Sequence, residues 1–262
     1  MKLNKLIAIA TISLLSGGIS MAQKALNLED IVAGNIIQTK GIGSMTWLKD
    51  GERYSRLENN KQTGGTDIVA YRAKDNSREV IIPSSLLTDK STGRPIPVRS
   101  VSWSADNEKV LIYNNTRRVW RYDTRGDYWV LNLKDGALRQ LGKGMPESSM
   151  MFAKFSPDGT RVAYVSNNNI YVEDIDSGKI TQLTKDGSDT IVNGTFDWVY
   201  EEEFSCRDGF RWSPDGKHIA YWQSDTKGTG VFDIINNVDS IYAKVIHFPY
   251  PKAGTTNSAV KD

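Results

Sequence analysis

The residues best suited to chemistry form an acidic run, Asp-Trp-Val-Tyr-Glu-Glu-Glu at positions 197–203, in which three consecutive carboxylates follow two large aromatic side chains. In a strand, adjacent side chains point to opposite faces, so neighbouring glutamates converge on one cation only from a turn or a short helix. A compact ammonium suits such a pair, because each hydrogen bond to a charged partner contributes about 1.5–3 kcal/mol. The run is therefore a candidate ammonium site, and a solvated acidic loop is the alternative.

Other reactive side chains are few. Cys206 is the only cysteine, which excludes an intrachain disulfide and a cysteine-rich zinc cluster, and three nearby carboxylates make it a poor thiolate nucleophile. We interpret it as structural. His218 lies in a predicted strand and His247 near the end of the sequence, so neither is a favoured general base. No Gly-x-Ser-x-Gly nucleophile elbow occurs. We expect no catalytic residue, no metal site and no cofactor in this chain.

Composition narrows the class of protein. With 262 residues, 39% of them hydrophobic and 10% aromatic, the chain can bury a core, which excludes wholesale disorder. It holds 33 basic and 31 acidic residues. Two of the basic residues, Lys2 and Lys5, lie in the first 22 positions, so the remainder has 31 against 31. Without a basic excess, a nucleic-acid partner is not expected.

The first 22 residues have the pattern of a secretory signal peptide. Lys2 and Lys5 precede an apolar stretch at positions 6–15, and small residues lead to Ser-Met-Ala at 20–22. The apolar stretch is well short of the ~20 residues that cross a bilayer. We expect cleavage near Ala22 and export of residues 23–262 to the periplasm or the extracellular space.

A repeat must position the acidic run. Four segments combine an aromatic residue with a short polar turn and then an alternating apolar run, and their aspartates, Asp50, Asp106, Asp158 and Asp215, are 56, 52 and 57 positions apart. The Ser-Pro-Asp-Gly turns at 156–159 and 213–216 suit a tight turn. Residues 161–165, 169–174, 179–183 and 218–222 read as strands. Hairpins repeated at this interval predict the four-stranded blades of a β-propeller, with a β-sandwich as the alternative.

Positions 197–203 also match, letter by letter, the D-W-x-Y-E-E-E signature of dipeptidyl peptidase IV, a serine peptidase of the prolyl oligopeptidase family, which this chain resembles. Residues 249–254 resemble the P-Y-P-K-A-G segment that follows the acidic motif at a similar distance in that family. Residues 27–31 resemble the mature N-terminus of its members.

This resemblance implies an eight-bladed propeller packed on a C-terminal α/β-hydrolase domain. It also implies removal of X-Pro and X-Ala dipeptides from free peptide N-termini. In the family the last two glutamates of the motif bind the α-ammonium of the substrate, a role that falls here on Glu202 and Glu203. An arginine on an earlier blade binds a substrate carbonyl. The Trp-Arg pair at 120–121, ahead of the strand at 128–133, assigns that role to Arg121, with Arg117, Arg118 and Arg125 as competitors.

We therefore predict an all-β fold, a partial β-propeller with about four of eight four-stranded blades, and no α/β-hydrolase domain in this chain. Three repeat steps are too few to close a propeller. The implied protein is the N-terminal part of an exported serine dipeptidyl peptidase, inactive alone. Its implied partners are a peptide with a free N-terminus, the missing hydrolase domain and, as is common in the family, a second copy of the full-length enzyme. The alternative is a non-catalytic periplasmic propeller that binds a protein or peptide through the acidic run.

Overall fold

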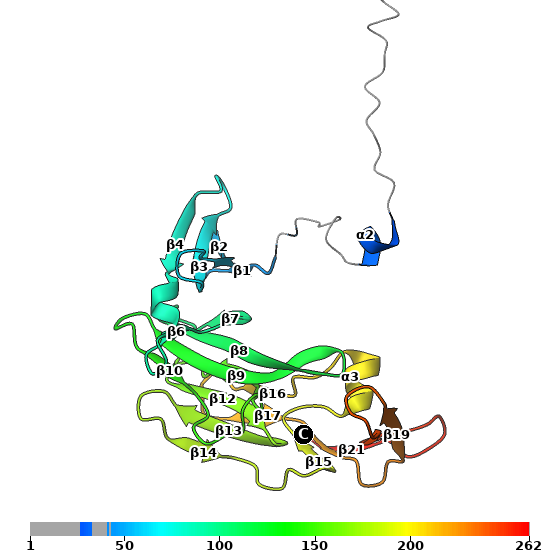
Figure 1. Ribbon diagram of the computed structural model, residues 1–262. Coiled ribbons are helices and arrows are strands. Elements are labelled where there is room, and N and C mark those ends of the chain that lie inside the picture. Colours follow the sequence, from blue (N-terminus) through cyan, green and yellow to red (C-terminus); the bar gives the residue numbers. More distant parts are fainter. Residues whose placement is uncertain (1–26, 33–40, 42, 262) are drawn as a thin grey trace, which may run out of the picture. The chain divides into compact units, whose positions relative to one another are not determined.

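The computed structural model describes residues 27–32, 41 and 43–261 (Figure 1). The predicted signal peptide, residues 1–22 with cleavage near Ala22, lies outside these residues and stays a prediction. The chain divides into two units, residues 1–43 and 44–262. In the first unit the structure describes one short helix, α2 (Leu28–Val32). Among the described helices, none has the length and apolarity needed to cross a membrane.

Antiparallel sheets in which each strand pairs with its neighbour along the chain make up most of the second unit. Three of these sheets have four strands each, as a propeller blade does. They are β1–β4 (Thr46–Trp47, Arg53–Asn59, Thr66–Arg72, Arg78–Ile82), β7–β10 (Ser100–Trp103, Lys109–Val119, Tyr122–Asn132, Leu138–Gln140) and β11–β14 (Met151–Phe155, Arg161–Ser166, Asn169–Asp174, Ile180–Gln182). The predicted all-β fold with four-stranded repeats is confirmed.

The fourth repeat departs from this plan because its strands are divided between two small sheets. One sheet pairs β16 (Phe210–Trp212) with β17 (Ile219–Tyr221), and the other contains β15 (Ile191–Asn193), β18 (Gln223–Asp225) and β21 (Ala259–Lys261). A separate hairpin joins β19 (Val231–Asn236) to β20 (Lys244–Pro249). Between the first two blades lie a 3-10 helix, Ser84–Leu87, and a short pair, β5 (Thr88–Asp89) and β6 (Arg94–Pro95).

The predicted polar turns join the first strand of a repeat to the second. In the third repeat the N–H of Gly159 donates to the carbonyl of Ser156 (2.9 Å), and in the fourth the N–H of Gly216 donates to Ser213 (2.9 Å). Both glycines have a positive φ, 67° and 68°, which glycine adopts without steric cost. The Ser156 hydroxyl also donates to the Asp158 carboxylate at 2.5 Å. Local chemistry therefore fixes each turn, as the sequence predicted.

Apolar side chains between successive sheets form the core. One cluster joins the first sheet to the second through Ile68, Ile82, Val110, Ile112 and Leu131, each with no exposed surface. Two further clusters join the second sheet to the third, around Tyr164, and the third sheet to β16, around Phe210. Because these apolar side chains are buried between the faces of adjacent sheets, the stability of each blade depends on the neighbouring blade.

Two features extend beyond the repeat and bring the candidate site together. Strands β8 and β9 have eleven residues each, far longer than β7 and β10. In Figure 1 the tip of this hairpin lies beside helix α3 (Trp198–Phe204), drawn in yellow. The tip carries Trp120 and Arg121, and α3 carries the acidic run.

Candidate functional site

The acidic run folds as a short helix, one of the two backbone forms in which neighbouring glutamates could converge on one cation. The Asp197 carboxylate caps the start of α3 by accepting a hydrogen bond from the N–H of Tyr200 (3.1 Å), which satisfies one of the free donors of the first turn. The Ser258 hydroxyl donates to the other Asp197 oxygen. The helix ends at Ser205, which adopts a left-handed conformation with φ 53°, and the N–H of Cys206 donates to the Tyr200 carbonyl (3.0 Å).

The three glutamates of α3 have three different surroundings. Glu201 is buried, with 3% of its surface exposed. Glu202 is largely covered, with 14% of its side chain exposed. Glu203 is exposed, and its side chain forms no ion pair or hydrogen bond with the residues that the structure describes. Consecutive helix positions do not face each other. One helical turn therefore directs Glu201 into the core, Glu202 toward Arg121 of the hairpin tip, and Glu203 into solvent.

Glu201 forms a buried ion pair with Arg207, whose Nε lies 3.1 Å from Glu201 Oε2. The two side chains are 1% and 15% exposed. The contact is not aligned as a hydrogen bond, and within the described residues neither Glu201 oxygen accepts one. Burial raises the pKa of Glu201 despite the opposing charge of Arg207, and burial likewise lowers the pKa of Arg207. Arg207 also donates through Nη1 to the Phe196 carbonyl (2.6 Å).

The sequence does not indicate this pair: Glu201 belongs to the acidic run, and nothing in the pattern singles out Arg207. No helical spacing relates the two residues, because the helix ends between them. Only the folded backbone after α3 brings the guanidinium back to the carboxylate.

Of the four arginines considered for carbonyl binding, Arg121 is the one that pairs with the acidic run. Its Nε donates to both oxygens of Glu202, at 2.9 and 2.7 Å, and 70% of its side chain remains exposed. Of the competing arginines, Arg118 donates instead to the Trp120 carbonyl (3.2 Å). Arg117 and Arg125 are register partners within the hairpin, and burial, followed by the charge of Arg117, lowers the pKa of Arg125.

Aromatic packing holds the hairpin tip against α3. The ring of Phe248, on β20, lies 5.0 Å from Trp120 of the hairpin tip and 5.3 Å from Trp198 of the helix, between ring centroids. Tyr250, two positions further along the chain, also packs on Trp198, at 4.8 Å between ring centroids. Trp120 has a φ of 55°, which is uncommon for a bulky side chain and marks a constrained turn. The P-Y-P-K-A-G segment thus contributes packing to the candidate site.

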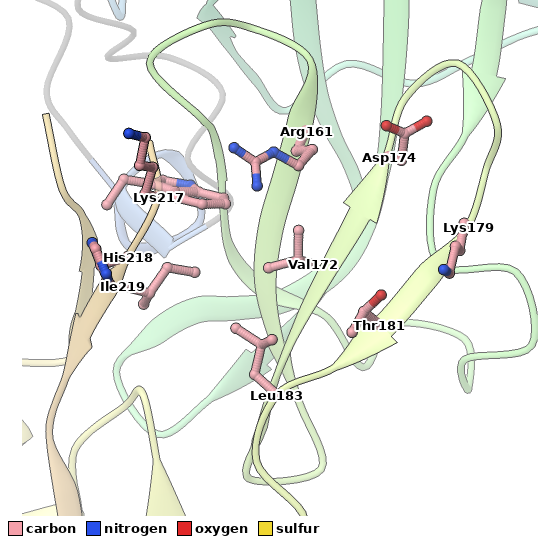
Figure 2. Close-up of a pocket in the computed structure, with 10 residues that line it drawn as sticks. Arg161, Val172, Asp174, Lys179, Thr181, Leu183, Lys217, His218 and Ile219 are labelled. Carbon is pink, nitrogen blue, oxygen red and sulfur yellow. The ribbon is translucent and has the colours of Figure 1, made fainter. Parts of the chain in front are cut away.

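Neither predicted glutamate lines the cavity nearest to α3. That cavity, of about 670 Å³, is lined by the half-buried Cys206 together with Tyr200, Arg207, Asp208 and Trp222, among other residues. A smaller cavity, of about 260 Å³, lies between strands β12–β14 and the β16–β17 pair (Figure 2). His218 lines this second cavity, which contains no predicted site residue. His247 lies on β20 with Nδ1 2.6 Å from Asp233.

Among the residues that the structure describes, no three His, Cys, Asp or Glu side chains are grouped so that they could hold a metal ion. The local chemistry is that of charge pairs. The three glutamates of α3 and the two arginines, Arg121 and Arg207, leave one net negative charge, with its exposed part on Glu203.

Comparison with known proteins shows which family the chain belongs to. The family described as the N-terminal region of dipeptidyl peptidase IV matches residues 104–261, more than half of the chain. Dipeptidyl aminopeptidase B of Saccharomyces cerevisiae is 31% identical over 242 residues, which cover 87% of this chain and 28% of that protein. Prolyl endopeptidase FAP of Mus musculus is 28% identical over 241 residues, covering 91% of this chain and 30% of that protein.

Among solved structures, dipeptidyl peptidase 4 of Porphyromonas gingivalis matches with a TM-score of 0.76 and 26% identity, over 90% of this chain and 33% of that one. The chain therefore spans about a third or less of the length of these relatives. The chain belongs to the family of the dipeptidyl peptidase IV N-terminal region.

Proposed function

We propose that this chain is the substrate-binding N-terminal part of an exported serine dipeptidyl peptidase that releases X-Pro and X-Ala dipeptides. In this proposal Glu202 and Glu203 bind the α-ammonium of the peptide, and Arg121 binds a backbone carbonyl near it. The groups that cleave the peptide bond would lie outside the present residues. Relatives named as dipeptidyl aminopeptidases support the reaction class.

The ion pair between Arg121 and Glu202 is the observation that carries the proposal. It joins two residues 81 positions apart, which the family resemblance assigns to one substrate. The recorded hydrogen bonds of Arg121 within the described chain use Nε. Its terminal amino groups are therefore available to a carbonyl oxygen, since most of the side chain is exposed.

Charge balance also favours an ammonium ligand. Arg207 compensates Glu201, and Arg121 compensates Glu202, so among the three glutamates of α3 the charge of Glu203 is left for a cation. A peptide α-ammonium carries one positive charge and three donors, and in this proposal it contacts the exposed Glu203 and the lone pairs of Glu202 that Arg121 leaves free. The last turn of α3 holds no basic residue, and the end of a helix favours a cation.

Recognition of the amine would explain why the bond after the second residue of the peptide is the one cleaved. An ammonium fixed at α3 sets how far the peptide enters, and the carbonyl contact of Arg121 sets its direction. The bond after the second residue would then be held at the nucleophile, which is a contribution of positioning. A blocked N-terminus carries no positive charge and would leave the two carboxylates unsatisfied.

The test measures kcat/KM for an X-Pro substrate with Glu202→Ala and Glu203→Ala variants of the full-length enzyme. Each should lose about 10- to 150-fold, because a charge-assisted contact of about 1.5–3 kcal/mol disappears and the substrate charge loses one of its partners. Glu79→Ala, an exposed glutamate on β4, is the matched control and should retain activity. Activity of the first two variants equal to that of the control would refute the assignment. Substrate binding should also weaken above about pH 8, where a peptide α-amine loses its proton.

A further inference from the structure

Strand β11 contains an irregularity that the blade repeat does not require. Its pairing with β12 shifts register between Met151 and Lys154, as in a β-bulge. Within the shift, Phe152 has a φ of 56°. A bulky residue in the left-handed region is strained, and such strain and bulges gather near functional sites. Lys154 follows this bulge directly.

The Lys154 ammonium is held by three groups. Its Nζ lies 2.5 Å from Asp208 Oδ1 and 3.1 Å from the Phe152 carbonyl, and 3.5 Å from the centroid of the Phe210 ring. About a quarter of the side chain is exposed. Arg211 is the other charged group nearby, with Nη1 3.1 Å from the second oxygen of Asp208.

Burial lowers the pKa of Lys154 to about 8, although the charge of Asp208 opposes the shift, and Arg211 adds to the lowering. A lysine with the ordinary value of 10.5 is almost entirely protonated near neutral pH. The neutral fraction of Lys154 is therefore about 200-fold larger at about pH 7.5. An amine is a nucleophile only when it is neutral, so the lowered pKa of Lys154 favours nucleophilic attack by this side chain.

A cavity of about 520 Å³ is lined by Lys154 and Asp208, together with the aromatic residues Trp103, Phe152 and Phe155. This volume lies within the range of small-molecule sites. Aromatic walls around one amine and one carboxylate suit a flat apolar ligand with a single electrophilic carbon.

We propose that Lys154 is a covalent binding site for a small aromatic aldehyde and that Asp208 transfers the protons. Asp208 first accepts one proton from the ammonium, which leaves a neutral amine with two protons on its nitrogen. This nitrogen attacks the carbonyl carbon: a C–N bond forms, the C=O π electrons move to oxygen, and one nitrogen proton is transferred to that oxygen to give a hydroxyl. Asp208 then returns its proton to the hydroxyl, the C–O bond breaks as water leaves, and Asp208 takes the last nitrogen proton, which gives the imine. The balance from the neutral amine is one amine plus one aldehyde to one imine plus one water, with no oxidant or reductant.

Lys134 provides a matched internal control. It also pairs with a carboxylate, Glu108, at 2.6 Å, but 67% of its side chain is exposed. Its pKa is raised by that hydrogen bond, whereas burial lowers that of Lys154. The two lysines thus differ in burial and in the adjoining cavity, and not in the presence of an acidic partner.

The experiment incubates the folded chain with benzaldehyde and cyanoborohydride at about pH 7.5 and measures the rate of modification of each lysine by peptide mass mapping. Lys154 should react at least ~10-fold faster than Lys134, and its rate should level off above about pH 8 while that of Lys134 continues to rise. Equal or slower modification of Lys154 would overturn the proposal. Propanal should show a smaller preference for Lys154 than benzaldehyde does, and an equal preference would refute an aromatic ligand.

Two variants separate chemistry from folding. Lys154→Arg keeps a cation beside Asp208 and should leave the rate at Lys134 unchanged while the labelling of the 151–155 strand disappears. Asp208→Asn keeps the shape of the side chain but cannot accept the proton, so imine formation at Lys154 should slow by ~10-fold or more. An unchanged or faster rate in a variant with wild-type circular dichroism would contradict the role of Asp208. Persistence of the Lys154 preference in urea-unfolded chain would show that the fold does not create it.

Discussion

The buried pair of Glu201 and Arg207 yields a prediction about stability that can be worked out from the structure. The substitution Arg207→Met keeps the length and apolar volume of the side chain but removes its charge. It leaves the Glu201 carboxylate with 1% of its side chain exposed and no hydrogen-bond donor among the described residues. Among the positive charges that act on the Glu201 carboxylate, that of Arg207 has the largest effect, so its removal is not offset by another residue.

Removal of one partner from a buried ion pair costs about 3–5 kcal/mol, since an uncompensated charge stays in the interior. For a unit of this size each kcal/mol corresponds to a shift of about 2–4 °C in Tm. We therefore expect Arg207→Met to lower Tm by about 6–20 °C. The matched control is Arg121→Met on the neighbouring glutamate. There the arginine is 70% exposed, so the expected loss is only about 0–1 kcal/mol.

The pH dependence distinguishes a charge effect from lost packing. Burial raises the pKa of Glu201 above its ordinary value of 4.5, so the folded state holds this proton more tightly than the unfolded chain. The stability that this group contributes is present below pH 4.5 and declines as pH rises through the raised pKa. Loss of Arg207 raises that pKa further. The difference in unfolding free energy between wild type and Arg207→Met should thus be largest at about pH 7.5 and smaller at about pH 4.5, as measured by urea unfolding. A difference under about 1 kcal/mol, or one that does not change with pH, would refute the reasoning.

Substitutions at three further positions test the residues that support the site, by the same unfolding measurement. Asp197→Ala removes the cap of α3 and the acceptor of the Ser258 hydroxyl and should cost about 1–2 kcal/mol, whereas Asp197→Asn should retain most of the cap; equal losses would argue against capping. Phe248→Ala empties the contact between the hairpin tip and α3 and should cost about 3 kcal/mol, and a loss under 1 kcal/mol would show that the aromatic packing is not structural. Gly209→Ala places a Cβ 3.0 Å from the backbone of Gly194 and of Thr195 and should cost about 1–3 kcal/mol; wild-type stability would mean that this backbone contact can relax.

The blade repeat could be predicted from sequence because its causes are local. A serine, an aspartate and a glycine within four residues determine a turn, and the alternating run after it determines a strand. The strand predicted at residues 169–174 coincides with β13. The strand predicted at 218–222 is shorter, because β17 covers Ile219–Tyr221. Such features need no information from distant parts of the chain.

The surroundings of the three glutamates could not be predicted in this way. The letters Glu-Glu-Glu are identical, but Arg207 pairs with the first, Arg121 with the second, and the third remains exposed. These differences depend on the rotation of one helical turn and on two segments that approach it from different parts of the chain. The ion pair between Lys154 and Asp208 likewise depends on the tertiary fold, because the two residues are 54 positions apart in the sequence.

The site forms where the chain departs from its repeat. The extension of β8 and β9, the helix α3 and the β19–β20 hairpin are not required by a four-stranded blade, and Phe248 packs against the first two of these. Regular blades with closely packed faces provide a rigid support, whereas insertions between their strands can change without loss of the core. If Phe248 sets the distance between Arg121 and Glu202, the distance available to a bound ligand depends on aromatic packing outside the charged residues. The acidic residues alone therefore do not define the site. The tip of the β8–β9 hairpin and the aromatic segment that supports this tip also belong to the site.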